Sequence, residues 1–155
     1  MLRMPNPIQV LLFAVALATA LVLPPSRVGP AAAEAQGKVK VLYHVDGKDP
    51  EVAKYALALI NKHIDAEGGP DKIDVELVVH GPALAAFKAK AASGATSSRF
   101  AGLVQQGLVP QACGNTMHGM DITLADLLDG FHVADKGGVV KLAELQGQGY
   151  VYLRP

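Results

Sequence analysis

Between residues 38 and 45, apolar positions alternate with mostly polar ones in the order KVKVLYHV. A period of two is typical of a β-strand, and the Val and Tyr side chains favour that conformation. A nearly continuous apolar run at residues 73–79 predicts a second strand, and shorter runs predict three more, at residues 108–113, 131–134 and 150–153. Pro110 lies inside the third strand, although proline in a sheet is normally confined to an edge or a bulge.

Helical signals separate these strands. Residues 49–51 read Asp-Pro-Glu and supply an N-cap, a proline at the first helical position and an acid in the first turn. Apolar residues then recur on one helical face until Gly68 and Gly69 end the helix. The small residues at 93–98 predict a loop. Further helical segments are predicted at residues 81–91, 99–106, 116–120, 123–129 and 139–145.

Strands and helices alternate along the whole chain after residue 36. Such alternation is typical of a mostly parallel sheet with helices on both faces. We therefore predict an α/β fold, a three-layer domain with a mostly parallel five-stranded sheet, formed by residues 36–155 as a single domain.

The first 35 residues have the features of a cleavable export signal. Arg3 precedes an apolar run at residues 8–23, and the small residues at 31–35 suit cleavage after Ala33 or Ala35. Cleavage would leave a periplasmic or otherwise exported domain without stable membrane insertion. An uncleaved membrane anchor is the alternative, because the apolar run is only just short of the roughly 17 residues that span a bilayer.

Composition excludes several classes of function. The 14 basic and 14 acidic side chains balance, aromatic residues make up 5% of the chain, and Trp is absent, so we expect no nucleic-acid partner. A single Cys excludes an internal disulfide and a Cys-x-x-Cys site. The sequence also lacks the dinucleotide fingerprint, the phosphate loop, the serine elbow and the His-Glu-x-x-His motif, and we predict no cofactor.

Polar side chains follow three of the predicted strands. His44 and Asp46 come at the end of the first strand, His80 follows the second, and Cys113 ends the third. Ligands of open parallel sheets bind at the carboxyl ends of the strands, so these residues are expected to share one edge. Whether they touch depends on the strand order, which the spacing does not give.

Cys113 is the strongest candidate for chemistry. A helix that begins in the following Gly-Asn-Thr would offer free amides, which favour a thiolate over a thiol. Asn115 and Thr116 could bond a sulfur or an oxyanion held on Cys113, although both are common turn residues. His44 and His80 could serve as bases or hydrogen-bond partners, or could be ordinary strand-end histidines.

Two other interpretations remain open. Cys113, Met117, His118 and Met120 combine thiolate, thioether and imidazole, the donors that Cu(I) prefers, and a small-ligand or copper-binding module could use them or His80. Their spacing matches no metal motif, so we assign no metal ligand. In the other interpretation, the chain is an oligomeric interaction domain with a buried and inert thiol.

Several segments together indicate a known family. They are the first strand with its following helix, VVHGP at 78–82, CGNTM at 113–117, and the stretch from Gly138 to Tyr150. With these segments, residues 38–155 resemble the DsrE/DsrF/DsrH-like family, whose α/β domains act in sulfur oxidation and sulfur relay.

This resemblance implies that Cys113 carries persulfide sulfur. It implies sulfur donor and acceptor proteins, or small sulfur compounds, as partners, and a homotrimer or homohexamer as the assembly. Two features depart from the cytoplasmic relay proteins, namely the export signal and the lack of a second thiol. The resemblance leaves open whether the protein turns over as a sulfurtransferase or only carries sulfur.

Overall fold

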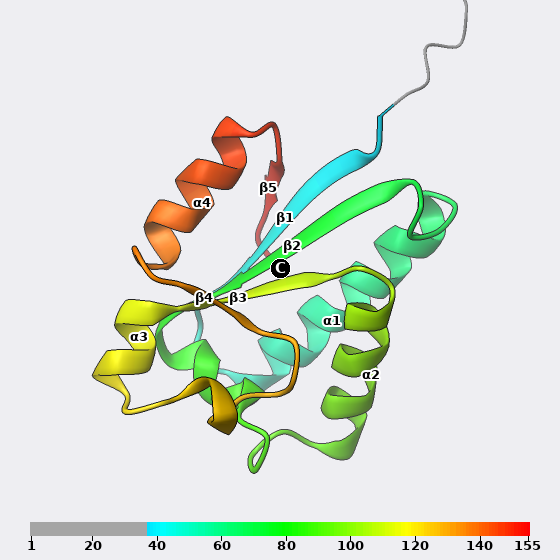
Figure 1. Ribbon diagram of the computed structural model, residues 1–155. Coiled ribbons are helices and arrows are strands. Elements are labelled where there is room, and N and C mark those ends of the chain that lie inside the picture. Colours follow the sequence, from blue (N-terminus) through cyan, green and yellow to red (C-terminus); the bar gives the residue numbers. More distant parts are fainter. Residues whose placement is uncertain (1–36) are drawn as a thin grey trace, which may run out of the picture. The chain divides into compact units, whose positions relative to one another are not determined.

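Five strands form one sheet in the order β4-β3-β2-β1-β5 (Figure 1). The computed structural model describes residues 37–155, so the predicted export signal lies outside the described residues. Every pairing between neighbouring strands is parallel, which confirms the predicted parallel sheet. The strands are β1 (Val39–Val45), β2 (Ile73–Val79), β3 (Val109–Cys113), β4 (His132–Ala134) and β5 (Val151–Leu153).

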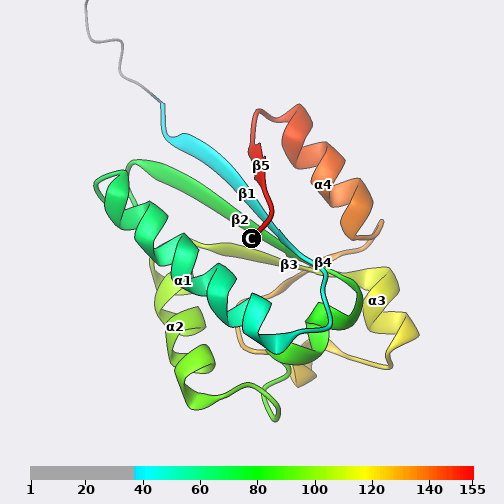
Figure 2. The same ribbon diagram turned by 180° about the vertical axis from the view of Figure 1, so that it is seen from behind.

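Helices cover both faces of this sheet, as predicted. Helices α1 (Pro50–Ala66) and α2 (Gly94–Gln105) lie on one face and α4 (Gly138–Gly147) lies on the other, which is clearest when Figure 1 and Figure 2 are compared. Shorter elements follow the carboxyl ends of β2 and β3. They are the 3-10 helix η1 (Gly81–Phe87), α3 (Gly114–Gly119) and the 3-10 helix η2 (Leu124–Asp126).

Side-chain alternation along the strands divides the hydrophobic core in two. Odd-numbered residues of β1 and β2 pack with α1, α2 and the three phenylalanines Phe87, Phe100 and Phe131. On the opposite face, Leu42 and Val78 pack against two leucines of α4. Because His44 follows Leu42 by two positions, its side chain belongs to the α4 face.

The predicted loop at residues 93–98 is wrong, because α2 begins at Gly94. The Oγ of Ser93 accepts a hydrogen bond from the amide of Thr96 at 3.2 Å, and the Thr96 side chain is buried beneath the first turn. This N-cap satisfies an amide that the helix itself leaves free, and it starts the helix within the run of small residues.

The helix predicted for residues 81–91 is shorter than expected. Element η1 ends at Phe87, because the chain then pairs with the segment after η2. The amide of Leu128 donates to the carbonyl of Phe87 at 2.9 Å, and the amide of Ala89 donates to Asp126 at 2.8 Å. These tertiary hydrogen bonds replace the ones that a longer helix would make.

Pro110 fits inside β3 because the fourth strand is short. Pro110 pairs with Leu77 of β2, whereas β4 pairs with β3 only from Gln111 onward. At the level of the proline, β3 is therefore an edge strand, where the missing amide proton is tolerated. None of the helices in residues 37–155 has the length and apolar character that crossing a bilayer requires.

We expect Ser93→Ala to lower the free energy of unfolding by about 1 kcal/mol, because the substitution removes the N-cap of α2. Urea denaturation followed by circular dichroism measures this change. The matched control is Ser98→Ala, at an exposed position inside the same helix, which should be neutral or slightly stabilising. Equal effects of the two substitutions would contradict the role of the cap.

Candidate functional site

The carboxyl ends of β1, β2 and β3 bring the predicted candidates to one edge of the sheet. His44 lies near the end of β1, His80 directly follows β2, and Cys113 is the last residue of β3. The rings of His44 and His80 are stacked, with centroids 4.7 Å apart and an angle of 24° between their planes. The pairing of β1 with β2, which the sequence did not reveal, therefore places these two histidines in contact.

Gly138, the first residue of α4, fits between His80 and Cys113. A Cβ atom on Gly138 would lie 3.0 Å from the Cβ of His80 and 3.2 Å from the Cβ of Cys113. Both distances are shorter than ordinary van der Waals contact, so a residue with a side chain would force the backbone away. Glycine thus lets the N-terminus of α4 reach the thiol.

The surroundings of Cys113 favour a thiolate. Burial raises the pKa of the Cys113 thiol, but hydrogen bonds from the Thr116 hydroxyl and from the amides of Gly138, Thr116 and Asn115 outweigh it and lower the pKa below its ordinary value. Cys113 is also the N-cap residue of α3, and Gly138 is the first residue of α4, so the thiol lies at the start of two helices. The residue is only 6% exposed, so it reaches the surface narrowly.

Asn115 and Thr116, both singled out from the sequence, surround the thiol. The Oγ1 of Thr116 accepts a hydrogen bond from the amide of Gly81 at 2.9 Å, which leaves its own proton for the sulfur of Cys113. The side chain of Asn115 lies against Gly137, where a Cβ would be 2.6 Å from Asn115 Nδ2. The backbone of Gly137 has a φ of 95°, which also favours glycine.

His44 is buried on the α4 face of the sheet. Its Nδ1 lies 2.7 Å from the hydroxyl of Tyr152 on β5. Burial lowers the pKa of His44, and the neighbouring His80 lowers it further, while Asp46 acts in the opposite direction. Burial and His80 therefore favour the neutral imidazole.

Asp46 forms an ion pair that the sequence did not suggest. Arg154 donates to Oδ1 of Asp46 at 2.8 Å and to Oδ2 at 3.1 Å. Burial raises the pKa of Asp46, but the hydrogen bond and charge of Arg154 prevail and lower it. Sequence reasoning missed Tyr152 and Arg154, because only the pairing of β5 with β1 brings the last strand to this edge.

The donors considered for the alternative copper-binding interpretation lie in different surroundings. Met117 packs in the hydrophobic core, and His118 is exposed on α3. Cys113 instead faces the start of α4.

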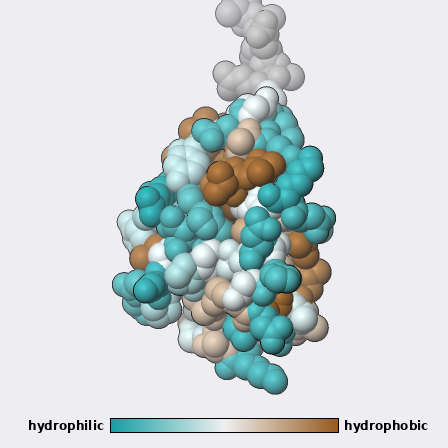
Figure 3. Space-filling model, turned by 90° about the vertical axis from the view of Figure 1, so that its left-hand side faces the viewer, coloured by the Kyte–Doolittle hydropathy of each residue, from teal (hydrophilic) through white to brown (hydrophobic). Residues whose placement is uncertain are grey.

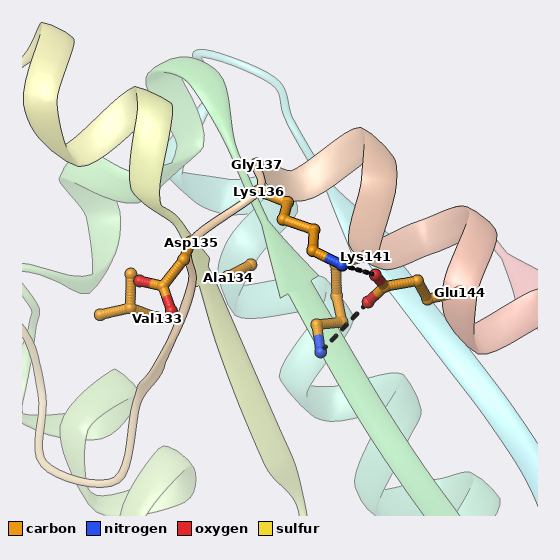
Figure 4. A pocket seen from close by; sticks show the side chains of 7 residues that line it. All are labelled: Val133, Ala134, Asp135, Lys136, Gly137, Lys141 and Glu144. Carbon is orange, nitrogen blue, oxygen red and sulfur yellow. Dashed lines mark hydrogen bonds and ion pairs between the residues drawn. The ribbon is translucent and has the colours of Figure 1, made fainter.

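A surface hollow adjoins the loop that carries Gly137 (Figure 4). Glu144 of α4 pairs with Lys136 at 3.3 Å and with Lys141 at 3.7 Å, and Asp135 adds a second carboxylate. The charges of the hollow therefore balance, and they provide no net attraction for an anion.

We expect Gly138→Ala to lower the free energy of unfolding by about 1–3 kcal/mol, because the added methyl overpacks the contact with His80 and Cys113. Urea denaturation measures the change. Gly147→Ala, at the other end of the same helix, is the control. Nothing lies within 4 Å of a Cβ there, so this variant should be as stable as the parent or more so. A neutral Gly138→Ala would contradict the close approach.

We expect the alkylation of Cys113 by iodoacetamide to have its pH midpoint below that of the urea-unfolded chain. The folded pKa is the lower one, so between the two values the unfolded chain binds more protons. The free energy of unfolding should therefore increase with pH across this window. A native midpoint at or above the unfolded one would refute an activated thiol.

The same titration tests the hydroxyl of Thr116. Thr116→Val removes a donor to the sulfur, so the midpoint should rise and the thiolate fraction at neutral pH should fall by up to about tenfold. Thr123→Val, the same change at the N-cap of η2, should leave the midpoint where it was.

No protein-family model and no curated protein matches the chain significantly, but solved structures do. MTH1491, a protein of unknown function from Methanobacterium thermoautotrophicum, has a TM-score of 0.67 and 22% identity, covering 76% of this chain and 100% of its own. The ychN protein from E. coli has a TM-score of 0.61 and 20% identity, covering 76% and 99%. BT1422 from Bacteroides thetaiotaomicron, also of unknown function, has a TM-score of 0.51 and 15% identity, covering 75% and 94%. At these identities the likeness establishes a shared fold, and the chain has the α/β architecture of MTH1491 and ychN.

Proposed function

We propose that this protein is an exported sulfur carrier that holds sulfur as a persulfide on Cys113. The observation that carries the proposal is the set of donors around the chain's single cysteine. Three backbone amides and the hydroxyl of Thr116 lower the pKa of this thiol despite its burial. Such surroundings are typical of nucleophilic cysteines, whereas structural cysteines lie in apolar surroundings that raise the pKa.

The transfer step needs only a thiolate and a donor that carries sulfane sulfur. The Cys113 thiolate attacks the outer sulfur of a donor persulfide, a new sulfur–sulfur bond forms at Cys113, and the donor's sulfur–sulfur bond breaks to release the donor as a thiolate. The proton of the donor persulfide stays with the transferred sulfur or goes to solvent. Delivery to an acceptor thiolate reverses these events, so no external oxidant or reductant is required.

The donors around Cys113 suit both states of this cycle. Amides of Asn115, Thr116 and Gly138 that stabilise a thiolate can also stabilise the terminal sulfur of a persulfide, which is likewise anionic. His80 packs against Gly138 and lines the site beside Cys113, and His44 stacks on the ring of His80. The proposal assigns binding roles to these histidines and the nucleophilic role to Cys113 alone.

Export, partners and assembly complete the proposal. The apolar run at residues 8–23 supports export, and the chain would then meet donor and acceptor proteins or small sulfur compounds outside the cytoplasm. The resemblance to the DsrE/DsrF/DsrH-like family supports a sulfur relay. MTH1491 and ychN, which have a DsrE-like fold, share the architecture of this chain and support the same proposal.

A homotrimer or homohexamer is consistent with an exposed apolar surface at the start of α4. Val139 and Val140 follow Gly138 and are 69% and 41% exposed. Figure 3 views the side that carries α3 and α4 and shows apolar patches among polar side chains. A second copy of the chain on these valines would bury apolar surface beside the thiol.

Mass spectrometry of the intact protein tests the carrier function. After brief exposure to inorganic polysulfide, the protein should gain the mass of one sulfur atom, and dithiothreitol should remove it. Cys113→Ser has no thiol and should gain nothing, and Thr116→Val should gain the sulfur more slowly at neutral pH.

Two outcomes of these experiments would contradict the carrier function. No sulfur adduct on a protein whose thiol reacts with iodoacetamide would refute the carrier function. A thiol that reacts with neither reagent until the chain unfolds would support an interaction domain with an inert cysteine instead.

A further inference from the structure

A second cluster of chemically active side chains lies beside the thiol. His44 and Asp46 come from the end of β1, and His80 follows β2. Each residue offers one nitrogen or oxygen atom, and the three atoms all lie within 4.8 Å of one another. Cys113 is not a member of this group.

One ring nitrogen of His44 is buried without a partner. The residue is 6% exposed, and among residues 37–155 its Nε2 has no hydrogen-bond partner. A buried polar atom in this state is destabilising by about 1–3 kcal/mol unless another group satisfies it. The atom that lacks a partner lies 4.0 Å from Oδ2 of Asp46, another member of the cluster.

The hydroxyl of Tyr152 prepares this nitrogen for coordination. When Nδ1 of His44 donates its proton to Tyr152 at 2.7 Å, Nε2 carries the free lone pair. Histidines that bind metal ions usually donate their second nitrogen in this way, which fixes both the tautomer and the orientation of the ring.

Asp46 remains able to coordinate although Arg154 holds it. Arg154 bonds both carboxylate oxygens, at 2.8 and 3.1 Å, and orients the group toward His44. A carboxylate has about four lone-pair sites, so each oxygen keeps room for a metal ion. The negative charge of Asp46 would offset part of the charge of a bound cation.

His80 supplies the third donor. Within the described part of the chain its ring makes no hydrogen bond or ion pair, and it stacks on His44 at 4.7 Å. In a tetrahedral site, two ligands at about 2.1 Å from the ion lie about 3.4 Å apart. His44 Nε2 and Asp46 Oδ2 are 4.0 Å apart, so small turns of the Asp46 carboxylate and of the His80 ring would bring the three donor atoms to this spacing.

We propose that His44, Asp46 and His80 bind a divalent transition-metal ion of the Zn²⁺ class. Two imidazole nitrogens and one carboxylate oxygen are a donor set that suits Zn²⁺, whereas Cu(I) prefers sulfur and Mg²⁺ and Ca²⁺ prefer oxygen alone. Three protein ligands leave one tetrahedral position open to water or to a small ligand. This inference goes beyond sulfur carriage and does not depend on it.

Isothermal titration calorimetry of the full-length chain with zinc chloride tests the site. The parent should bind one Zn²⁺ per chain, and His80→Ala and Asp46→Asn should each weaken binding at least about tenfold. Both residues are partly exposed, and His80→Ala keeps the Cβ that packs against Gly138. Circular dichroism checks that the variants are folded.

Two control variants separate this site from other ligands and from the thiol. His118→Ala removes an exposed histidine of α3, and Cys113→Ser removes the thiol. Both should keep the parent affinity for zinc. NMR of the histidine side chains should show zinc-dependent shifts for His44 and His80.

Zinc binding that survives in both His80→Ala and Asp46→Asn would overturn the assignment. So would the absence of one-to-one binding to the parent protein. Loss of binding in Cys113→Ser would also overturn it and would place the ion on the thiol, whereas failure of the sulfur-carrier proposal would leave the zinc result unchanged.

Discussion

The close approach of Gly138 to His80 and Cys113 is the contact on which the candidate site depends. It brings the first amide of α4 to the thiol of Cys113, which is the last residue of β3 and the N-cap residue of α3. A larger residue at this position would separate the helix from the strand ends, and the thiol would lose a donor while staying buried. The acidity of the Cys113 thiol therefore depends on how closely α4 packs against the strand ends.

The unequal covering of the sheet explains why this site can exist at all. Two long helices and three phenylalanines bury one face completely, whereas α4 covers the other face alone. Polar side chains can therefore lie on the α4 face close to solvent. Gln111 and Glu76 share this face and bond at 3.1 Å, and burial raises the pKa of Glu76.

Two sites with different chemistry share the carboxyl edge. Around Cys113, amide protons provide positive potential for an anionic sulfur. Around His44, two imidazole rings and one carboxylate offer lone pairs that suit a cation. His80 contacts both, since it packs on Gly138 and stacks on His44, so it separates the two environments.

Local sequence patterns determined most of the fold and the choice of Cys113. The alternation of apolar and polar residues, the helix caps and the glycines that end helices all act between neighbouring residues. The five strands, the first helix and the position of the thiol at a strand end follow from these local signals. Helix boundaries that depend on distant hydrogen bonds, such as the end of η1 at Phe87, did not follow. The strand order, the stacked histidines and the partners Tyr152 and Arg154 were decided by tertiary structure alone, because β5 meets β1 across more than 100 residues of intervening chain.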